Sequence, residues 1–451
     1  MNPSTDPPVR SPLRAILALS FPIVVVNVGM MFMGTVDTLM VGRVSAEALA
    51  AVAIGNVYFY GLVMLGVGIL LALDPVISQA LGAEDHLGVT LGVQRGMLLA
   101  ALLSLPVMVL LALGEPILRR LDQPAEVMPL VGTYCVLLVP GVFPFLAFNV
   151  GRQTLQAMHR VAPIVWTIVI ANLANVGLNR WLIFGGLGVA PMGVAGSAWA
   201  TTISRVLMAV MVFQLGRGDL AGTLRPWHPE SWGRRALYRL FRLGLPIGIQ
   251  IEIEFAAFST VALLMGTFGT VAVAGHQIAL NLASLTFMVP MGVGMGAAVV
   301  VGRAVGRHDP ARLRAAARAA LGVGAGFMFC TAGVLLLLPR FLASLYSTDP
   351  AVVAFAAALL PIAGIFQVFD GLQVVSAGIL RGLGDTAAPM LINLVGFAGV
   401  GISASILLAF KTSLGPVGLW WGLVLGLSSV ALILLLRVRV AIQRPRARVA
   451  T

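Results

Sequence analysis

The sequence predicts an all-α integral membrane protein with twelve transmembrane helices in two six-helix lobes, related by a pseudo-two-fold axis along the membrane normal. Three observations support this fold class: the composition, the number of long apolar stretches and an internal repeat. Of the 451 residues, 59% are hydrophobic and 10% are charged, whereas about a quarter are charged in ordinary soluble domains. Because a soluble surface needs charge, this composition excludes soluble enzymes, disordered chains and disulfide scaffolds.

The apolar stretches are long enough for twelve crossings of a bilayer, each of which needs about 20 residues. We expect helices at residues 13–40, 48–75, 92–113, 128–151, 161–185, 192–215, 240–265, 271–300, 313–338, 351–377, 388–410 and 416–436. Cys135 and Cys330 lie in two of these stretches without a CxxC motif or a neighbouring His, so they are predicted to be packing residues. The single lysine, Lys411, follows Phe410, so the chain lacks the Gly-Lys-[Ser/Thr] of an ATP-binding loop.

The basic residues are distributed unevenly between the two sides of this topology. Of 29 Lys and Arg, 22 fall on the side of the termini and 6 on the opposite side. Such asymmetry places both termini in the cytoplasm, so we expect a multi-pass protein of the inner (plasma) membrane. The net charge of +12 is then a topology signal and a contact with anionic membrane lipids, and nucleic acid is not an expected partner.

The two halves of the sequence resemble each other at an offset of 221 to 224 residues. Three pairs of segments correspond: Phe21-Pro22 with Leu245-Pro246, Gln79–Gly82 with Arg303–Gly306, and Pro140–Arg160 with Pro361–Arg381. Because six crossings return the chain to its starting side, a duplicated six-helix unit gives two parallel repeats. Such paired bundles are typical of secondary transporters.

The repeat predicts the domain organisation. We assign residues 1–215 to an N-lobe, 216–239 to a cytoplasmic connector, and 240–451 to a C-lobe with a basic cytoplasmic tail. In the connector, Trp227, Trp232 and the run Arg234–Arg239 suit a helix lying at the membrane interface. A solvated basic loop is the alternative interpretation.

Ionisable residues within the predicted helices are the first candidates for a functional site. Five acids fall there: Asp37, Asp74, Glu252, Glu254 and Asp370. Each costs about 2.5–3.5 kcal/mol at the bilayer centre on insertion scales, so each should face a cavity or a partner. A buried carboxyl group can carry a proton, and carboxylates with amide oxygens can bind Na⁺.

Glu254 and Asp370 lie deep in their helices, where few basic partners are predicted, which favours a functional role. Asp37 lies near the outer end of the first helix and is either a coupling acid or a helix-end acid. Asn172, Asn175 and Asn179 share one helix face and either line a polar pocket with Asp37 or join helices by hydrogen bonds.

Further polar residues complete the candidate pocket. Gln250 and Glu252 precede Glu254 on one helix, and Glu252 is about 200° around that helix from Glu254. Gln277 and Asn281 form a polar stripe with His276, which we interpret as a packing histidine.

Four motifs resemble the multidrug and toxic compound extrusion (MATE) transporters of the NorM type. The motifs are MGTVDTLMVG from Met33, ANVGLNRWLIFG from Ala174, HQIALNLASLTFMVPMGVG from His276 and FQVFDGLQVVSAGILRGLGD from Phe366. The resemblance implies a twelve-helix transporter that exports cationic amphipathic drugs or metabolites in exchange for H⁺ or Na⁺. It also implies that Glu254 and Asp370 form a cation site of the C-lobe, and that Asp37 acts in the N-lobe beside Asn175 and Asn179.

Two residues depart from the family pattern. Phe366 stands where the NorM-type pattern often has Tyr, so one hydroxyl ligand for Na⁺ at Glu254 and Asp370 is lost, which favours H⁺. Glu252 is an additional acid for substrate recognition or a second proton. We expect no cofactor beyond the coupling ion, and a monomer.

Three other functions compete with a multidrug efflux antiporter. The nearest is a flippase for lipid-linked or other amphipathic substrates of the same superfamily, although the mostly acidic midplane favours cationic cargo. An intramembrane enzyme would need a motif such as HExxH or DDxxD, which the sequence lacks, so we do not expect an enzyme. The third is an ion channel, which saturable exchange against a counter-gradient would exclude.

Overall fold

The computed structural model describes all residues except 1–10, 121–123, 187, 444–447 and 450–451. Three of the arginines behind the predicted charge asymmetry, Arg10, Arg444 and Arg446, therefore lie outside the described residues. Within the described part of the chain, twelve helical segments are long and apolar enough to cross a membrane, which confirms the predicted number. The described residues otherwise contain one isolated β-bridge, between Gly186 and Val189.

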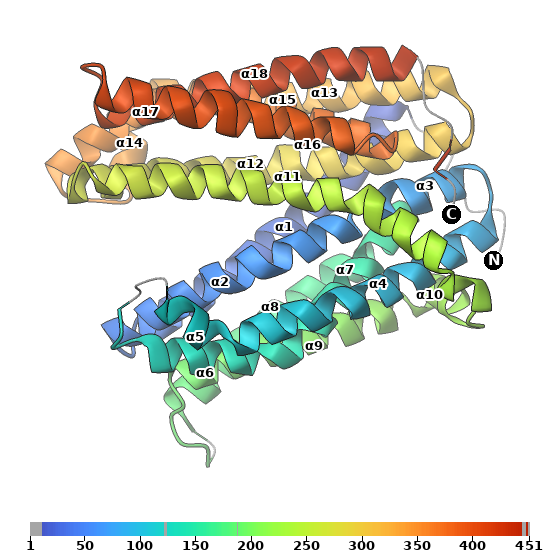
Figure 1. Ribbon diagram of the computed structural model, residues 1–451, viewed down its shortest axis with the longest axis horizontal. Coiled ribbons are helices and arrows are strands. Elements are labelled where there is room, and N and C mark those ends of the chain that lie inside the picture. The colour runs from blue at the N-terminus through green and yellow to red at the C-terminus, as the bar shows by residue number, and fades with distance from the viewer. Residues whose placement is uncertain (1–10, 121–123, 187, 444–447, 450–451) are drawn as a thin grey trace. The chain divides into compact units, whose positions relative to one another are not determined.

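The helices follow one another along the chain with short connections (Figure 1). They are α1 (Pro12–Val41), α2 (Ala46–Leu70), α3 (Leu73–Gly82), α4 (His86–Ala112), α5 (Gly114–Arg119), α6 (Met128–Leu138), η1 (Val139–Gly141), α7 (Val142–Ala157), α8 (Ala162–Phe184), α9 (Val194–Leu215), α10 (Arg217–Leu224), η2 (Pro229–Trp232), α11 (Arg234–Gly266), α12 (Thr270–Gly306), α13 (Pro310–Leu337), α14 (Pro339–Ser344), α15 (Pro350–Gly382), α16 (Ala387–Asn393), η3 (Leu394–Ile402), α17 (Ser403–Phe410) and α18 (Pro416–Gln443).

Three membrane spans are interrupted rather than straight. The second span breaks between α2 and α3, and the fourth passes through the 3₁₀ turn η1, which contains Pro140 and therefore lacks one backbone donor. The eleventh span passes through η3, a π-helical segment. Gly396 and Gly401 of η3 pack against α18, where a Cβ at Gly396 would collide with Val430. Such π segments are frequent at functional sites, and this one begins directly after Asn393.

The turns between spans repeat the internal symmetry at the level of single residues. Glu84 and His308, which are 224 positions apart, adopt positive φ angles of 57° and 54°. The next residue in each turn caps the following helix, since Asp85 accepts the N–H of Gly88 at 2.7 Å and Asp309 accepts that of Arg312 at 2.9 Å. The duplication inferred from the sequence therefore has a structural counterpart.

One sequence correspondence is shifted. Arg160 ends its turn by donating its N–H to Leu155 at 2.8 Å, and Asp385 makes the same bond to Leu380 at 2.9 Å. The counterpart of Arg160 is therefore Asp385 and not Arg381. The two residues also hold ion pairs of opposite polarity: Arg160 pairs with Asp219 at 3.3 Å, and Asp385 pairs with Arg437 at 2.7 Å.

The chain forms two compact units whose boundaries differ from the expected lobes. One unit contains the chain through Val24 and from Ile249 onward, and the other extends from Val25 to Gly248. The divisions fall within α1 and α11 rather than at the connector. In the unit that contains most of the C-terminal half, α12, α13, α15 and α18 lie side by side, and in the other unit α8 packs on α9 and α4 on α7 (Figure 1).

Glycines allow the first part of α1 to pack in the unit that contains most of the C-terminal half. They likewise allow the first part of α11 to pack in the other unit. A Cβ at Gly292 of α12 would lie 2.6 Å from Cγ2 of Val24 on α1. In the other unit, Gly244 and Gly248 of α11 lie against the backbone of Ile69 and Leu65 on α2. Small residues permit such close backbone approach between membrane helices.

We expect Gly244→Val to prevent correct packing of α11 on α2. The added side chain meets the carbonyl oxygen of Ile69, and backbone cannot move aside as a flexible side chain can. The yield of monodisperse protein on size-exclusion chromatography should fall severalfold. Gly266→Ala on the same helix meets nothing within 4 Å and should leave the yield unchanged; equal yields would disprove the packing argument.

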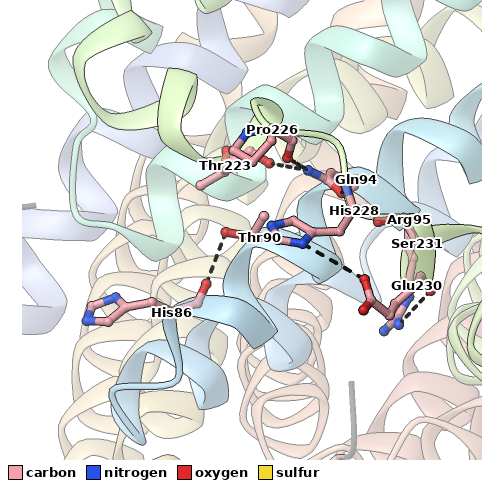
Figure 2. A network of polar contacts seen from close by, with 9 residues as sticks. All are labelled: His86, Thr90, Gln94, Arg95, Thr223, Pro226, His228, Glu230 and Ser231. Atoms are coloured by element: carbon pink, nitrogen blue, oxygen red, sulfur yellow. Dashed lines mark hydrogen bonds and ion pairs between the residues drawn. The ribbon is translucent and has the colours of Figure 1, made fainter.

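The connector is held against α4 by a buried glutamine (Figure 2). Gln94 Nε2 donates to the carbonyl oxygens of Thr223 at 3.2 Å and Pro226 at 2.9 Å, and its Oε1 accepts the His228 N–H at 3.0 Å and the Ser231 hydroxyl at 2.5 Å. These bonds fix the connector to α4. The connector consists of α10 and η2, and the basic run from residue 234 onward is the start of α11.

We expect Gln94→Leu to destabilise the protein. The substitution leaves several buried polar groups of the connector unpaired, and each costs about 1–3 kcal/mol. The apparent Tm in detergent should fall by about 5 °C. Thr90→Ala on the same helix is the matched control because Thr90 bonds only to His86 of its own helix, at 3.0 Å. An unchanged Tm for Gln94→Leu would mean that these bonds do not hold the connector.

Candidate functional site

A buried carboxylate, Asp37, forms the centre of a polar cluster in the unit from Val25 to Gly248. Its Oδ1 accepts the side-chain N–H groups of Asn175 at 3.1 Å and Asn179 at 2.5 Å. Its Oδ2 accepts the hydroxyl of Thr201 at 2.8 Å, and Asn179 also donates to Asn175 Oδ1 at 3.1 Å. All four side chains are at most 4% exposed. Asp37 is therefore a buried, hydrogen-bonded carboxylate near the end of α1.

Three helices position this first cluster. Asp37 lies near the end of α1, and Asn175 and Asn179 occupy successive turns of α8, which places their amides side by side. Asn172 does not join them, because its Nδ2 donates at 2.9 Å to Ile168 of its own helix. Thr201 of α9 was not among the predicted residues, and its only signal in the sequence is a hydroxyl pair in an apolar helix.

A second cluster forms around Glu254 in the unit from Ile249 onward. Glu254 Oε1 accepts side-chain N–H groups from Gln250 of α11 at 3.1 Å, Gln373 of α15 at 2.6 Å and Asn393 of α16 at 3.2 Å. Gln373 also donates to Asn393 Oδ1 at 3.3 Å. The carboxylate is thus held by three neutral amides from three helices. Sequence analysis missed Asn393, which is the last residue of α16 before the π-helical segment η3.

Asp370 lies on α15 three residues before Gln373, on the helix face that meets Glu254. The two carboxyl groups are close enough to act on each other electrostatically, and Asp370 is 8% exposed. One turn earlier, the buried Gln367 accepts the Thr331 hydroxyl from α13 at 3.2 Å. The structure therefore brings together the two acids that the sequence predicted for one site.

Other predicted pocket residues do not join either cluster. Gln277 and Asn281 of α12 are exposed in their unit, and Asn281 Oδ1 accepts the Tyr346 hydroxyl at 2.9 Å. Glu252 lies on α11 two residues before Glu254, about 200° around the helix from it. His276 Nδ1 accepts the Trp420 indole N–H at 3.2 Å, with the two rings edge to face, so the prediction of a packing histidine is confirmed.

The donor sets do not resemble a resident metal site. Within the described residues, no group of three or more His, Cys, Asp or Glu side chains is placed to hold a metal. Cys135 and Cys330 are both free. Phe366 packs edge to face against Phe258 and Trp420, at centroid distances of 5.8 and 5.9 Å, so its ring belongs to an aromatic cluster.

Buried cations also occur in the N-terminal repeat. Arg152 is 4% exposed, donates to Asn27 Oδ1 at 3.5 Å and acts electrostatically on Asp74, which is 1% exposed. Asp74 is therefore a buried acid of α3. Arg205 of α9 stacks on Phe59, with its Cζ 3.8 Å from the ring centroid.

Comparison with known protein families finds the same duplication that the sequence repeat predicted. A model of the MatE family matches two segments of the chain, residues 22–181 and 246–407. The chain belongs to the MATE family. The two matched segments begin at Pro22 and Pro246, which lie 224 positions apart, as the sequence repeat predicted.

Curated relatives of this MATE protein extend over nearly its whole length. A probable multidrug resistance protein NorM of Mesorhizobium japonicum is 38% identical over 443 residues, which cover 95% of this chain and 94% of the relative. The multidrug resistance protein PmpM of Pseudomonas aeruginosa is 36% identical over 440 residues, covering 95% and 91%. The resemblance to the NorM type is thereby confirmed.

Solved structures share the fold of this chain. The crystal structure of a MATE protein in the bent conformation aligns with a TM-score of 0.87 and 22% identity, covering 96% of this chain and 96% of that one. The crystal structure of the eukaryotic MATE transporter AtDTX14 aligns with a TM-score of 0.85 and 22% identity, covering 96% and 99%. The expectation of an all-α, twelve-helix membrane protein is confirmed.

Proposed function

We propose that this MATE protein is a proton-coupled antiporter that exports cationic amphipathic compounds by alternating access. A proton taken up from outside neutralises a buried carboxylate and releases the bound cation. After the empty protein turns inward, the carboxylate loses its proton and binds the next cation. Competition between proton and cargo for one carboxylate is sufficient to couple their movements.

The hydrogen bonds of Asp37 carry this proposal. Thr201 donates to Oδ2 at 2.8 Å, and a hydroxyl group can donate or accept. When a proton binds Oδ2, the hydroxyl of Thr201 can rotate and accept a hydrogen bond from the new carboxyl O–H. Asn175 and Asn179 continue to donate to Oδ1. The cluster therefore accommodates the charged and the neutral carboxyl group without losing a bond, as a proton carrier requires.

The surroundings of Glu254 favour a proton over Na⁺ as the coupling ion. In this arrangement three amides donate N–H groups to its Oε1, so they contact the carboxylate without directing an oxygen at it. Phe366 supplies no hydroxyl. With Asp370 nearby, two carboxyl groups share the site, and close like charges disfavour double ionisation.

The nature of the cargo follows from charge and from the relatives. Asp37, Glu254 and Asp370 attract cations, and the relatives are named for multidrug resistance. The distribution of Lys and Arg supports cytoplasmic termini in an inner membrane, so that cargo leaves the cytoplasm. We propose that the protein works as a monomer and needs no cofactor other than the coupling proton.

Transport in liposomes tests the proposal. Purified protein is reconstituted, and ethidium movement is followed under a pH gradient or a Na⁺ gradient imposed separately. We expect the pH gradient to drive ethidium transport and the Na⁺ gradient to have no effect. Transport under the Na⁺ gradient alone would contradict proton coupling, and no ethidium movement under either gradient would favour a flippase for amphipathic lipids.

A further inference from the structure

Arg205 of α9 is a buried cation held by aromatic rings instead of a carboxylate. The residue is 5% exposed, and its Cζ lies 3.8 Å from the ring centroid of Phe59 and 5.5 Å from that of Phe145. Its Nη1 is buried and has no hydrogen-bond partner among the described residues. Stacking on two ring faces stabilises the charge while leaving it unneutralised by a direct ion pair.

This charge lies beside the Asp37 cluster. Thr201, which donates to Asp37, precedes Arg205 by one turn on the same face of α9. The ionisable groups that act on Arg205 are Asp37, Tyr60 and Tyr134. Because phenols are uncharged at neutral pH, Asp37 and Arg205 together determine the net charge of this region.

The side chains around Asp37 contain one other charge. Asn175 and Asn179 of α8 and Thr201 of α9 are neutral donors, and Arg205 acts on Asp37 through space. Tyr134 of α6 also lies within electrostatic range, and its hydroxyl donates to Asn56 Oδ1 at 3.0 Å. Among the described residues that act on this cluster, protonation of Asp37 therefore leaves Arg205 as the one charged side chain.

We infer that Arg205 is a fixed counter-charge that makes the proton-loaded Asp37 cluster repel cationic cargo. This inference rests on the proposed function, since it assumes that Asp37 carries the coupling proton. Without Arg205, proton binding would change the local charge from −1 to 0 and merely remove an attraction. With Arg205, the change is from 0 to +1, and the cation is expelled.

The aromatic contacts explain how the charge can act without blocking the proton. A direct Arg–Asp ion pair would hold the carboxylate ionised and compete with protonation. Stacking on Phe59 and Phe145 holds the guanidinium of Arg205 near the Asp37 carboxylate without a direct ion pair. Two unit charges about 10 Å apart at an effective dielectric constant of about 20 change a binding constant roughly tenfold, which is enough to influence cargo release.

Equilibrium binding of tetraphenylphosphonium to the purified protein tests the inference, measured on both sides of neutral pH. In native protein, affinity should fall on acidification. Arg205→Gln should strengthen cation binding at acidic pH roughly tenfold, and Arg205→Lys, which keeps the charge, should bind as native protein does. Arg180→Gln is the matched control, because Arg180 stacks on Phe184 at 5.5 Å at an exposed position of the same unit, and it should behave as native.

A double variant provides a readout that a purely structural role would not change. Asp37→Asn leaves a fixed positive charge, so it should bind the cation weakly at every pH. Adding Arg205→Gln to that variant removes the charge and should strengthen binding roughly tenfold. Weaker or unchanged binding of the double variant would overturn the counter-charge inference.

The same series separates this inference from the proposed function. If Asp37→Asn retains the native pH dependence, Asp37 is not the proton site and the proposed function fails at this residue. If Asp37→Asn abolishes the pH dependence but Arg205→Gln does not strengthen cation binding at acidic pH, only the counter-charge role fails. If Arg205→Gln does not fold, stronger cation binding by Arg205→Lys at acidic pH would still contradict a role that depends on charge.

Discussion

Glu254→Gln should abolish proton-driven export of cations while the protein remains folded. Glutamine has nearly the same shape as the carboxyl group and can keep contacts with Gln250, Gln373 and Asn393, but it cannot exchange a proton. We expect the rate of ethidium transport under a pH gradient to fall at least about 100-fold. This corresponds to a barrier raised by about 2.7 kcal/mol. Thermal stability should be kept or raised, because a buried charge is removed.

A surface acid provides the control for this substitution. Glu115 pairs with Arg119 at 2.7 Å and both side chains are partly exposed, so Glu115→Gln removes one negative charge from a surface ion pair. It should transport as native protein does. Substantial transport by folded Glu254→Gln would show that this carboxylate does not couple the ion to the cargo.

Asp37→Asn should be the second variant with a large loss of transport. The asparagine Oδ1 can accept from Asn175 and Asn179 and its Nδ2 can donate to Thr201, so the hydrogen bonds of the cluster persist. The negative charge and the proton site are both lost. We expect transport of a monovalent cation to fall at least about tenfold, since about 1.4 kcal/mol of cation binding is removed.

Two asparagines on one helix provide a matched comparison for this cluster. Asn179→Ala removes a donor to Asp37 and should reduce transport severalfold. Asn172→Ala removes a bond within α8 only and should leave transport unchanged. Equal effects of the two substitutions would mean that the bonds to Asp37 have no specific role.

The twelve spans could be predicted from the sequence because a bilayer requires long apolar helices whatever their packing. The domain boundary could not, since it depends on which helix Gly244 and Gly292 approach. Close approach depends on the surfaces of both packed helices, whereas the sequence around one glycine describes only its own helix. The connector illustrates the same limit, because nothing around Gln94 in the sequence indicates its four hydrogen bonds to residues more than a hundred positions away.

The acidic residues of the site could be predicted from the sequence, but their hydrogen-bond partners could not. Carboxyl groups such as Glu254 are conspicuous in an apolar helix, because their burial is costly. Thr201 and Asn393 are small polar residues that membrane helices tolerate at many positions, so their roles appear only when α9 and α16 are packed. Gln277 and Asn281 satisfied the same polar-stripe criterion as the asparagines of α8, yet both are exposed in their unit and Asn281 bonds to Tyr346.

Proton release on cargo binding is the most direct test of the central claim that proton and cation compete for the same carboxylates. Tetraphenylphosphonium is added to purified protein in weakly buffered solution near neutral pH, and a pH-sensitive dye reports the proton concentration. The account predicts proton release by native protein, and a reduced release by Glu254→Gln and by Asp37→Asn. Saturable binding of the cation to native protein without proton release would contradict it.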